Sequence, residues 1–139
     1  MQIKLIGLLV VFFALGDLIS NQLKYIFQRM RPAHAEYFFD LGGKGSFEPS
    51  LSFPSNHAFN LFALSTLLIL LRRKGYLKGV NFPIALWGLG LVVGISRVLL
   101  WRHYPLDIVA GLFFGTLFAM AFLPLITKVV HAPKLTDKL

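Results

Sequence analysis

The chain alternates between long apolar runs and short polar clusters. The apolar runs predict helices at about residues 3–27, 55–73, 82–101 and 105–127. A helix that crosses a membrane needs about 20 mostly apolar residues, and the first, third and fourth runs have that length. The second run has a shorter apolar centre, so it qualifies only if residues 54–57 form its first turn at one membrane surface. We therefore expect an all-α fold, an integral membrane helical bundle of about four transmembrane helices.

Composition favours a membrane protein over a soluble one. The chain has 139 residues, of which 56% are hydrophobic and only 14% are charged, whereas soluble domains are about 25% charged. Its length fits one domain, residues 1–139. The absence of cysteine excludes disulfides, thiolate metal sites and a cysteine nucleophile. The net charge of +8 comes from basic residues at the ends of the apolar runs, so we do not expect nucleic acid as a partner.

Charge also predicts the orientation. The short loop RRKGYLK, residues 72–78, carries four positive charges between the second and third runs. Short loops rich in lysine and arginine remain in the cytoplasm, so we expect both termini to be cytoplasmic and a loop at about residues 32–54 to lie outside. Six cations on the outer side do not fit this tendency and need another reason: Lys24, Arg29, Arg31, Lys44, Arg97 and Arg102.

The first outer polar cluster follows the first helix. Lys24 and Arg31 are seven residues apart, which is two helical turns and one face. They either reach up to the membrane surface or bind an anion. Asp17 lies seven residues before Lys24 on the same stripe. An intramembrane carboxylate usually faces the protein interior, so Asp17 either offsets the charge of Lys24 or contacts another helix.

The second cluster is FPSNHAF, residues 53–59. Ser55 or Asn56 is expected to cap the second helix. His57 then lies in the first turn, where free backbone N–H groups bind anions. The alternative is an ordinary helix cap beside a solvated histidine.

The third cluster is SRVLLWRHYPLD. Ser96 and Arg97 end the third helix, and His103 precedes Pro105, a residue that suits the first helical position. Asp107 falls in the first turn of the fourth helix. It either complements the helix dipole or holds His103 in one tautomer, which leaves the other ring nitrogen free for nucleophilic attack.

Together the clusters bring cations, two histidines, a carboxylate and a helix N-terminus to one membrane depth. Such a set suits phosphoryl transfer, which depends on positioning and charge stabilisation. Lys24, Arg31 and Arg97 would neutralise the phosphate oxygens. One histidine would attack phosphorus, and the other would protonate the leaving oxygen. No acidic cluster offers ligands for Mg²⁺, so we expect neither a metal nor a cofactor.

These motifs resemble those of the type 2 phosphatidic acid phosphatase family, relatives of vanadium haloperoxidases. The family motifs are K-x6-R-P, P-S-G-H and S-R-x5-H-x3-D, and the resemblance runs from about residue 23 to residue 115. Ten of the fixed positions match in order and spacing: Lys24, Arg31, Pro32, Pro54, Ser55, His57, Ser96, Arg97, His103 and Asp107.

The resemblance implies a metal-independent lipid phosphatase that works through a phosphohistidine intermediate. It implies that His103 is the nucleophile, Asp107 its orienting partner and His57 the general acid. It further implies a set of phosphate-binding residues, with Ser96 in a supporting place: Lys24, Arg31, Ser55, the backbone at Asn56, and Arg97.

Two departures from the family pattern matter. Asn56 replaces a glycine, which would allow positive φ and close approach to an anion. Because asparagine tolerates left-handed geometry, we expect the turn to survive, with a side chain that narrows the pocket or adds a donor.

Members also commonly have six helices, and this chain has room for about four. Either the family core suffices, or a second protomer covers the exposed face in a homo-oligomer.

The motif residues recognise a phosphate group and do not identify a particular lipid. We favour lipid A phosphate or undecaprenyl pyrophosphate as the substrate, at the periplasmic face of a bacterial inner membrane. Phosphatidylglycerol phosphate, phosphatidic acid and lipid-to-lipid phosphotransfer are alternatives. A non-enzymatic lipid-binding or transport protein is a further alternative, and it predicts the loss of at least one catalytic residue.

Overall fold

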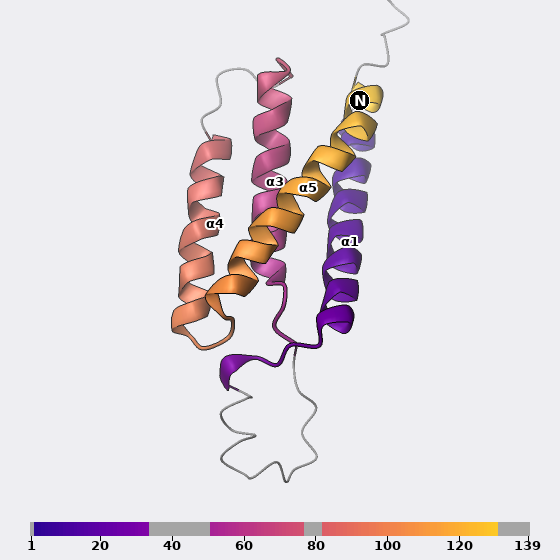
Figure 1. The fold of residues 1–139 in the computed structure, drawn as a ribbon. Coiled ribbons are helices and arrows are strands. Elements are labelled where there is room, and N and C mark those ends of the chain that lie inside the picture. Colours follow the sequence, from indigo (N-terminus) through magenta and orange to yellow (C-terminus); the bar gives the residue numbers. More distant parts are fainter. Residues whose placement is uncertain (1, 34–50, 77–81, 131–139) are drawn as a thin grey trace, which may run out of the picture.

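The computed structural model describes residues 2–33, 51–76 and 82–130, and long helices dominate these residues. Four of them are seen: α1 (Gln2–Phe27), α3 (Asn56–Arg73), α4 (Phe82–Leu99) and α5 (Pro105–Val130) (Figure 1). The all-α fold is thereby confirmed, and each helix begins and ends within three residues of its predicted bounds. Most of the expected outer loop, residues 34–50, lies outside the described residues.

Local sequence signals explain where α3 and α5 begin and where α3 ends. Ser55 is the N-cap of α3, and its hydroxyl accepts a hydrogen bond from the backbone N–H of Ala58. Pro105 is the first residue of α5, as its fixed φ favours. Beyond the end of α3, Gly75 takes φ +82°, and its N–H bonds back to the carbonyl of Arg72. Such a left-handed glycine is a common helix terminator.

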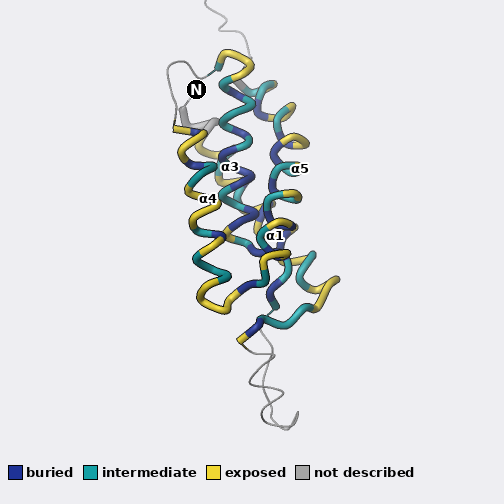
Figure 2. The backbone as a smooth tube through the Cα atoms, turned by 60° about the vertical axis from the view of Figure 1, so that its left-hand side comes forward, coloured by how far each residue is buried: buried dark blue, intermediate teal, exposed yellow. Residues whose placement is uncertain are grey.

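Helix α3 is the centre of the bundle. It contacts α1, α4 and α5, whereas α1 and α4 do not contact each other within the described residues. Helix α5 crosses α3 at an angle, and α4 and α1 lie on different sides of α3 (Figure 1). The buried positions gather along α3, and the outward faces of the other helices are largely exposed (Figure 2).

Two glycines allow α5 to approach α3 closely. A Cβ atom at Gly111 would lie 2.7 Å from Cβ of Ala58 and 2.9 Å from the carbonyl oxygen of Ser55. A Cβ atom at Gly115 would collide with the carbonyl oxygen of Phe59. Small residues serve this purpose in membrane helix pairs. The contact fixes the first turn of α3 against α5, which is the turn that carries His57.

The apolar core lies between α1, α3 and α5. Its centre is a set of aromatic rings, in which Phe12 lies 4.8 Å from Phe118 and 5.2 Å from Phe122 between ring centroids. Phe59 is fully buried against the same cluster. Leu67, Leu71 and Ile126 extend the core toward the end of α3, which leaves the other end of the bundle for polar groups.

Three described helices are long and apolar enough to cross a membrane: Ile6–Phe27, Phe82–Leu99 and Pro105–Val129. Their outward faces expose large apolar side chains, such as Val10, Val92 and Phe113. Helix α3 does not belong to this set, although its 18 residues span about 27 Å at 1.5 Å per residue. It tolerates more polar residues because neighbouring helices cover it. That α3 also crosses the membrane stays a prediction.

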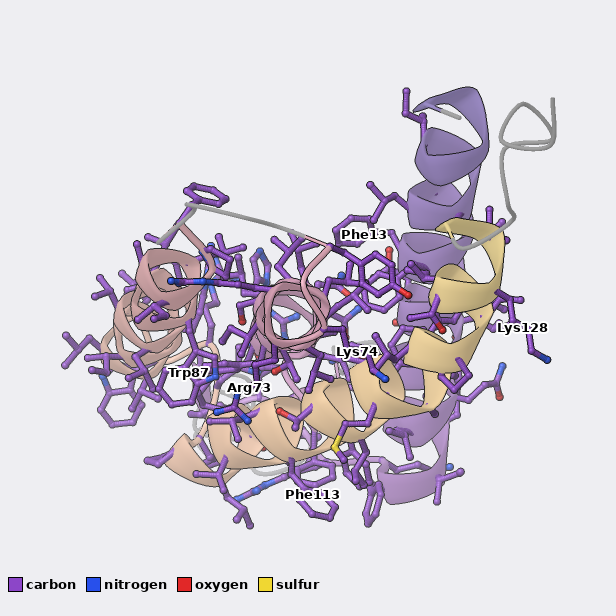
Figure 3. The ribbon with its side chains drawn as sticks, turned by 90° about the horizontal axis from the view of Figure 1, so that it is seen from above. Phe13, Arg73, Lys74, Trp87, Phe113 and Lys128 are labelled. Atoms are coloured by element: carbon purple, nitrogen blue, oxygen red, sulfur yellow. The ribbon has the colours of Figure 1, made fainter. Side chains whose placement is uncertain are left out.

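Basic residues mark the end where α3 and α5 finish. Figure 3 views the bundle from this end, with Arg73 and Lys74 near the middle and Lys128 on the outer side of α5. Arg72 and Arg73 occupy the last turn of α3, and Lys128 lies in the last turn of α5. Cations near helix C-termini are favourable for the helix dipole. The motif residues lie at the opposite end.

Candidate active site

Three segments that are far apart in the sequence meet where α1 ends and α3 and α5 begin (Figure 1). The N–H of Ser52 donates to the carbonyl of Arg29 at 2.7 Å, which joins the segment after α1 to the segment before α3. The N–H of Ser55 donates to the carbonyl of Asp107 at 3.1 Å, which joins the start of α3 to the start of α5. All three polar clusters predicted from the sequence therefore lie together.

His103 and Asp107 form a buried pair at the start of α5. Their side chains are 4% and 0% exposed, and Nδ1 of His103 lies 3.4 Å from Oδ2 of Asp107. That distance is within ion-pair range, but Nδ1 has no partner with hydrogen-bond geometry. The same Oδ2 accepts a 2.8 Å hydrogen bond from the N–H of Tyr104. Asp107 is thus fixed to the loop that carries His103.

Arg29 completes the surroundings of Asp107. Its Nη1 donates to Oδ1 of Asp107 at 3.1 Å, and its guanidinium lies 4.1 Å from the ring centroid of Tyr104. From the sequence, Arg29 is only one of the six outer cations, and no role is predicted for it. The sequence shows Arg29 only as a further cation close to Arg31. Nothing at that position indicates a partner 78 residues away.

A cavity of about 340 Å³ lies in front of His103. Four of the predicted site residues line it, namely Arg31, His57, Arg97 and His103. Leu100 and Arg102 complete the lining. Arg102 is a second residue without a role in the sequence-based prediction, and it adds a third guanidinium to the wall. The cavity is therefore lined by three guanidinium groups and two imidazoles.

The charges around the cavity favour an anion. Burial lowers the pKa of Arg31 below its ordinary value, and the neighbouring guanidiniums of Arg102 and then Arg97 lower it further. Nε of Arg97 is buried and has no hydrogen-bond partner. A buried donor without a partner is costly, and like charges at short range repel. A bound oxyanion would relieve both conditions.

Three other predicted phosphate-binding residues bond to the protein itself. The ammonium of Lys24 donates to the carbonyl of Pro54 at 2.8 Å and to that of Leu51 at 3.4 Å. The Ser55 hydroxyl caps α3, and the Ser96 hydroxyl donates to the carbonyl of Val93 at 2.7 Å. The described lining of the 340 Å³ cavity includes none of these three residues. Lys24 instead fixes the segment that leads into α3.

Asn56 does not adopt the left-handed geometry considered for it. It is the first residue of α3, and positive φ at described non-glycine residues occurs at Gln28 and Trp101 instead. Its amide accepts a hydrogen bond from the hydroxyl of Ser20 at 2.7 Å and donates to Asn21 at 3.1 Å. The asparagine that replaces the family glycine therefore ties α3 to α1, and its side chain does not enter the 340 Å³ cavity.

The arrangement can hold a tetrahedral oxyanion between guanidiniums, with two imidazoles in reach of it. Within the part of the chain that the structure describes, no group of three or more histidine, cysteine or acidic side chains is placed to hold a metal ion. A helical membrane bundle with an oxyanion cavity at one end is the class of protein that this fold and site define.

The chain belongs to the PAP2 superfamily, whose family model matches residues 5–130. It is 32% identical over 125 residues to a lipid A 1-phosphatase of Rhizobium etli, which covers 84% of this chain and 46% of that protein. It is 33% identical over 113 residues to a lipid A 4'-phosphatase of Bacteroides thetaiotaomicron, with 77% of this chain and 46% of the relative covered.

A third relative is the undecaprenyl-diphosphatase BcrC of Bacillus subtilis, 30% identical over 71 residues, which are 51% of this chain and 33% of that protein. The chain thus spans less than half the length of these relatives. No solved structure matches it. The family assignment confirms the resemblance inferred from the three motifs.

Proposed function

We propose that this protein is a metal-independent membrane lipid phosphatase that removes phosphate from a lipid phosphate or pyrophosphate. The observation that carries the proposal is one cavity lined by His57, His103, Arg31 and Arg97, with Asp107 buried behind His103. The relatives act, by their names, on lipid A and undecaprenyl diphosphate. We therefore keep lipid A phosphate and undecaprenyl pyrophosphate as the favoured substrates.

The reaction proceeds in two steps. His103 attacks phosphorus, a P–N bond forms, and the P–O bond to the lipid breaks while His57 donates a proton to the leaving oxygen. Water then attacks phosphorus and gives one proton to His57, the P–N bond to His103 breaks, and inorganic phosphate is released. Arg31 and Arg97 stabilise the charge on the phosphoryl oxygens in both steps.

Asp107 orients the nucleophile in this proposal. Its Oδ2 lies 3.4 Å from Nδ1 of His103, so a small reorientation of the imidazole brings the pair into hydrogen-bond geometry. A proton held on Nδ1 leaves Nε2 as the attacking nitrogen. Arg29 and the N–H of Tyr104 hold the carboxylate in place.

We also propose that the site faces the periplasm of a bacterial inner membrane and that both termini are cytoplasmic. The basic last turns of α3 and α5, at the end opposite to the site, support this orientation. The chain has no cysteine, so single-cysteine variants report topology directly. A thiol reagent that does not cross membranes should label Ala33→Cys in intact cells and spare Lys74→Cys. The reverse pattern would overturn the orientation.

Phosphate release by the purified protein in detergent with EDTA tests the activity. The panel contains lipid A, undecaprenyl pyrophosphate, phosphatidylglycerol phosphate and phosphatidic acid, with His103→Ala as the control. Release from one lipid that is lost in the variant supports the proposal and identifies the substrate. Release that requires an added metal, or persists in His103→Ala, would refute it.

A further inference from the structure

A second cavity of about 540 Å³ opens beside the first, between α1, α3 and α4. His57 and Arg97 line both cavities, so the two meet at these side chains. The second cavity has a mixed lining. Asp17, Asn56 and Asn60 are polar, and Leu89 is one of three apolar residues on its wall.

Asp17 is the unusual residue of this cavity. It lies in the candidate span Ile6–Phe27, it is exposed, and Nδ2 of Asn60 donates to its Oδ1 at 2.7 Å. Of the two roles left open for Asp17, contact with another helix is thus the one observed. A carboxylate has about four acceptor positions, and an intramembrane carboxylate is costly unless it faces a polar cavity or a partner. The cavity therefore offers acceptors to a ligand with N–H or O–H groups.

The direction of the reaction indicates which part of the substrate reaches this cavity. If His57 protonates the leaving oxygen, the group attached to that oxygen must lie on the His57 side of the phosphate. The second cavity begins there. Asn60 lies three residues after His57, about 5 Å further along α3, so a headgroup bonded directly to the phosphate can reach it. Leu61 and Val93 supply apolar surface beside these polar groups.

We propose that the second cavity binds the leaving group of the substrate, and that Asp17 and Asn60 select a leaving group with hydroxyl or amide donors, such as a phosphorylated sugar lipid. A prenyl phosphate leaving group carries no such donors next to its apolar chain. The proposal rests on the proposed phosphatase activity for the direction of the leaving group. Asp17 is a specificity residue in it and takes no part in the chemical steps.

The test compares Asp17→Asn with wild type on lipid A and on undecaprenyl pyrophosphate. Loss of one hydrogen bond to a charged group predicts a rise in KM for lipid A of about tenfold, with kcat changed less than about twofold. KM for undecaprenyl pyrophosphate should stay the same. Thr116→Val is the matched control, because Thr116 is a polar residue in a membrane helix that contacts Thr66 and does not line the second cavity. It should leave both substrates unaffected.

Binding separates failure of this inference from failure of the proposed function. Lipid A affinity is measured in the His103→Ala background, with and without Asp17→Asn, so no turnover is needed. Tenfold weaker binding with Asp17→Asn supports the inference even if the wild type releases no phosphate, an outcome that would refute only the proposed function. Equal binding, an equal rise in KM for both lipids, or turnover of undecaprenyl pyrophosphate alone would overturn the inference.

Discussion

Replacing Arg29 with alanine should destabilise the start of α5 and slow the reaction. Arg29 neutralises Asp107, which is fully buried, through a contact of 3.1 Å. At that distance the attraction between unit charges is about 1.3 kcal/mol in water and about 5 kcal/mol at an effective dielectric constant near 20. The Arg29 side chain is 35% exposed, so solvent screens the pair in part. We expect a loss of about 2–3 kcal/mol, in the range of hydrogen bonds to charged groups.

The assay is a double-mutant cycle with Asp107→Asn. Thermal or denaturant unfolding in detergent gives the free energy of unfolding of Arg29→Ala, of Asp107→Asn and of the double variant. If the two side chains interact as described, the coupling energy is about 2 kcal/mol, because Arg29→Ala costs little once the carboxylate is gone. Arg73→Ala, an exposed cation at the other end of the bundle, is the control and should change stability by less than about 0.5 kcal/mol.

Catalysis gives a second readout of the same contact. Arg29→Ala should lower kcat for phosphate release and leave KM nearly unchanged, since Arg29 does not line the 340 Å³ cavity. Arg29→Lys should restore part of kcat because it returns the charge without the planar guanidinium that lies over the Tyr104 ring. Additive effects in the stability cycle, or a rise in KM with kcat unchanged, would refute the assignment of Arg29 as a positioning residue for Asp107.

Three further predictions concern other parts of the molecule. Asp107→Asn should slow phosphate release without ending it, whereas His103→Ala should abolish release. Circular dichroism should show that His103→Ala keeps the fold. A larger loss of activity in Asp107→Asn than in His103→Ala would argue that Asp107 is structural. Gly111→Ala should cost about 1–3 kcal/mol of stability through overpacking against α3, while Gly88→Ala, whose added Cβ meets nothing within 4 Å, should be neutral or stabilising in the same unfolding assay. Gln28→Gly should raise the free energy of unfolding by up to about 1 kcal/mol, because Gln28 holds φ +45°, and a loss of stability would contradict that reason.

The sequence predicts the helices well because polar clusters separate the apolar runs and two of the helices begin at a local signal. Ser55 before α3 and Pro105 at the start of α5 are local signals, and both act as expected. The apolar centre of the second run was too short to settle whether it crosses the membrane. Its polar residues become understandable only in the fold, where α1, α4 and α5 surround α3.

The sequence also identifies the four motif residues that line the 340 Å³ cavity, because all of them lie at or just beyond helix ends on the same side of the bundle. It could not identify Arg29, since its partner Asp107 is 78 residues away and a cation next to Arg31 has no distinctive pattern. The same limit applies to Arg102. Asp17 was visible as an intramembrane carboxylate, but its bond to Asn60 joins two helices and has no local signal.

Trapping the phosphorylated protein tests the central claim most directly. Purified protein is mixed with a phosphate-labelled lipid substrate, quenched within milliseconds at alkaline pH, digested and analysed by mass spectrometry, with His57→Ala included to test the proton donor. The account predicts an alkali-stable, acid-labile phosphoryl group on His103 in the wild type and none on His57. Phosphate on any other side chain, or steady turnover with no phosphorylated protein at any quench time, would contradict the assignment of His103 as the nucleophile.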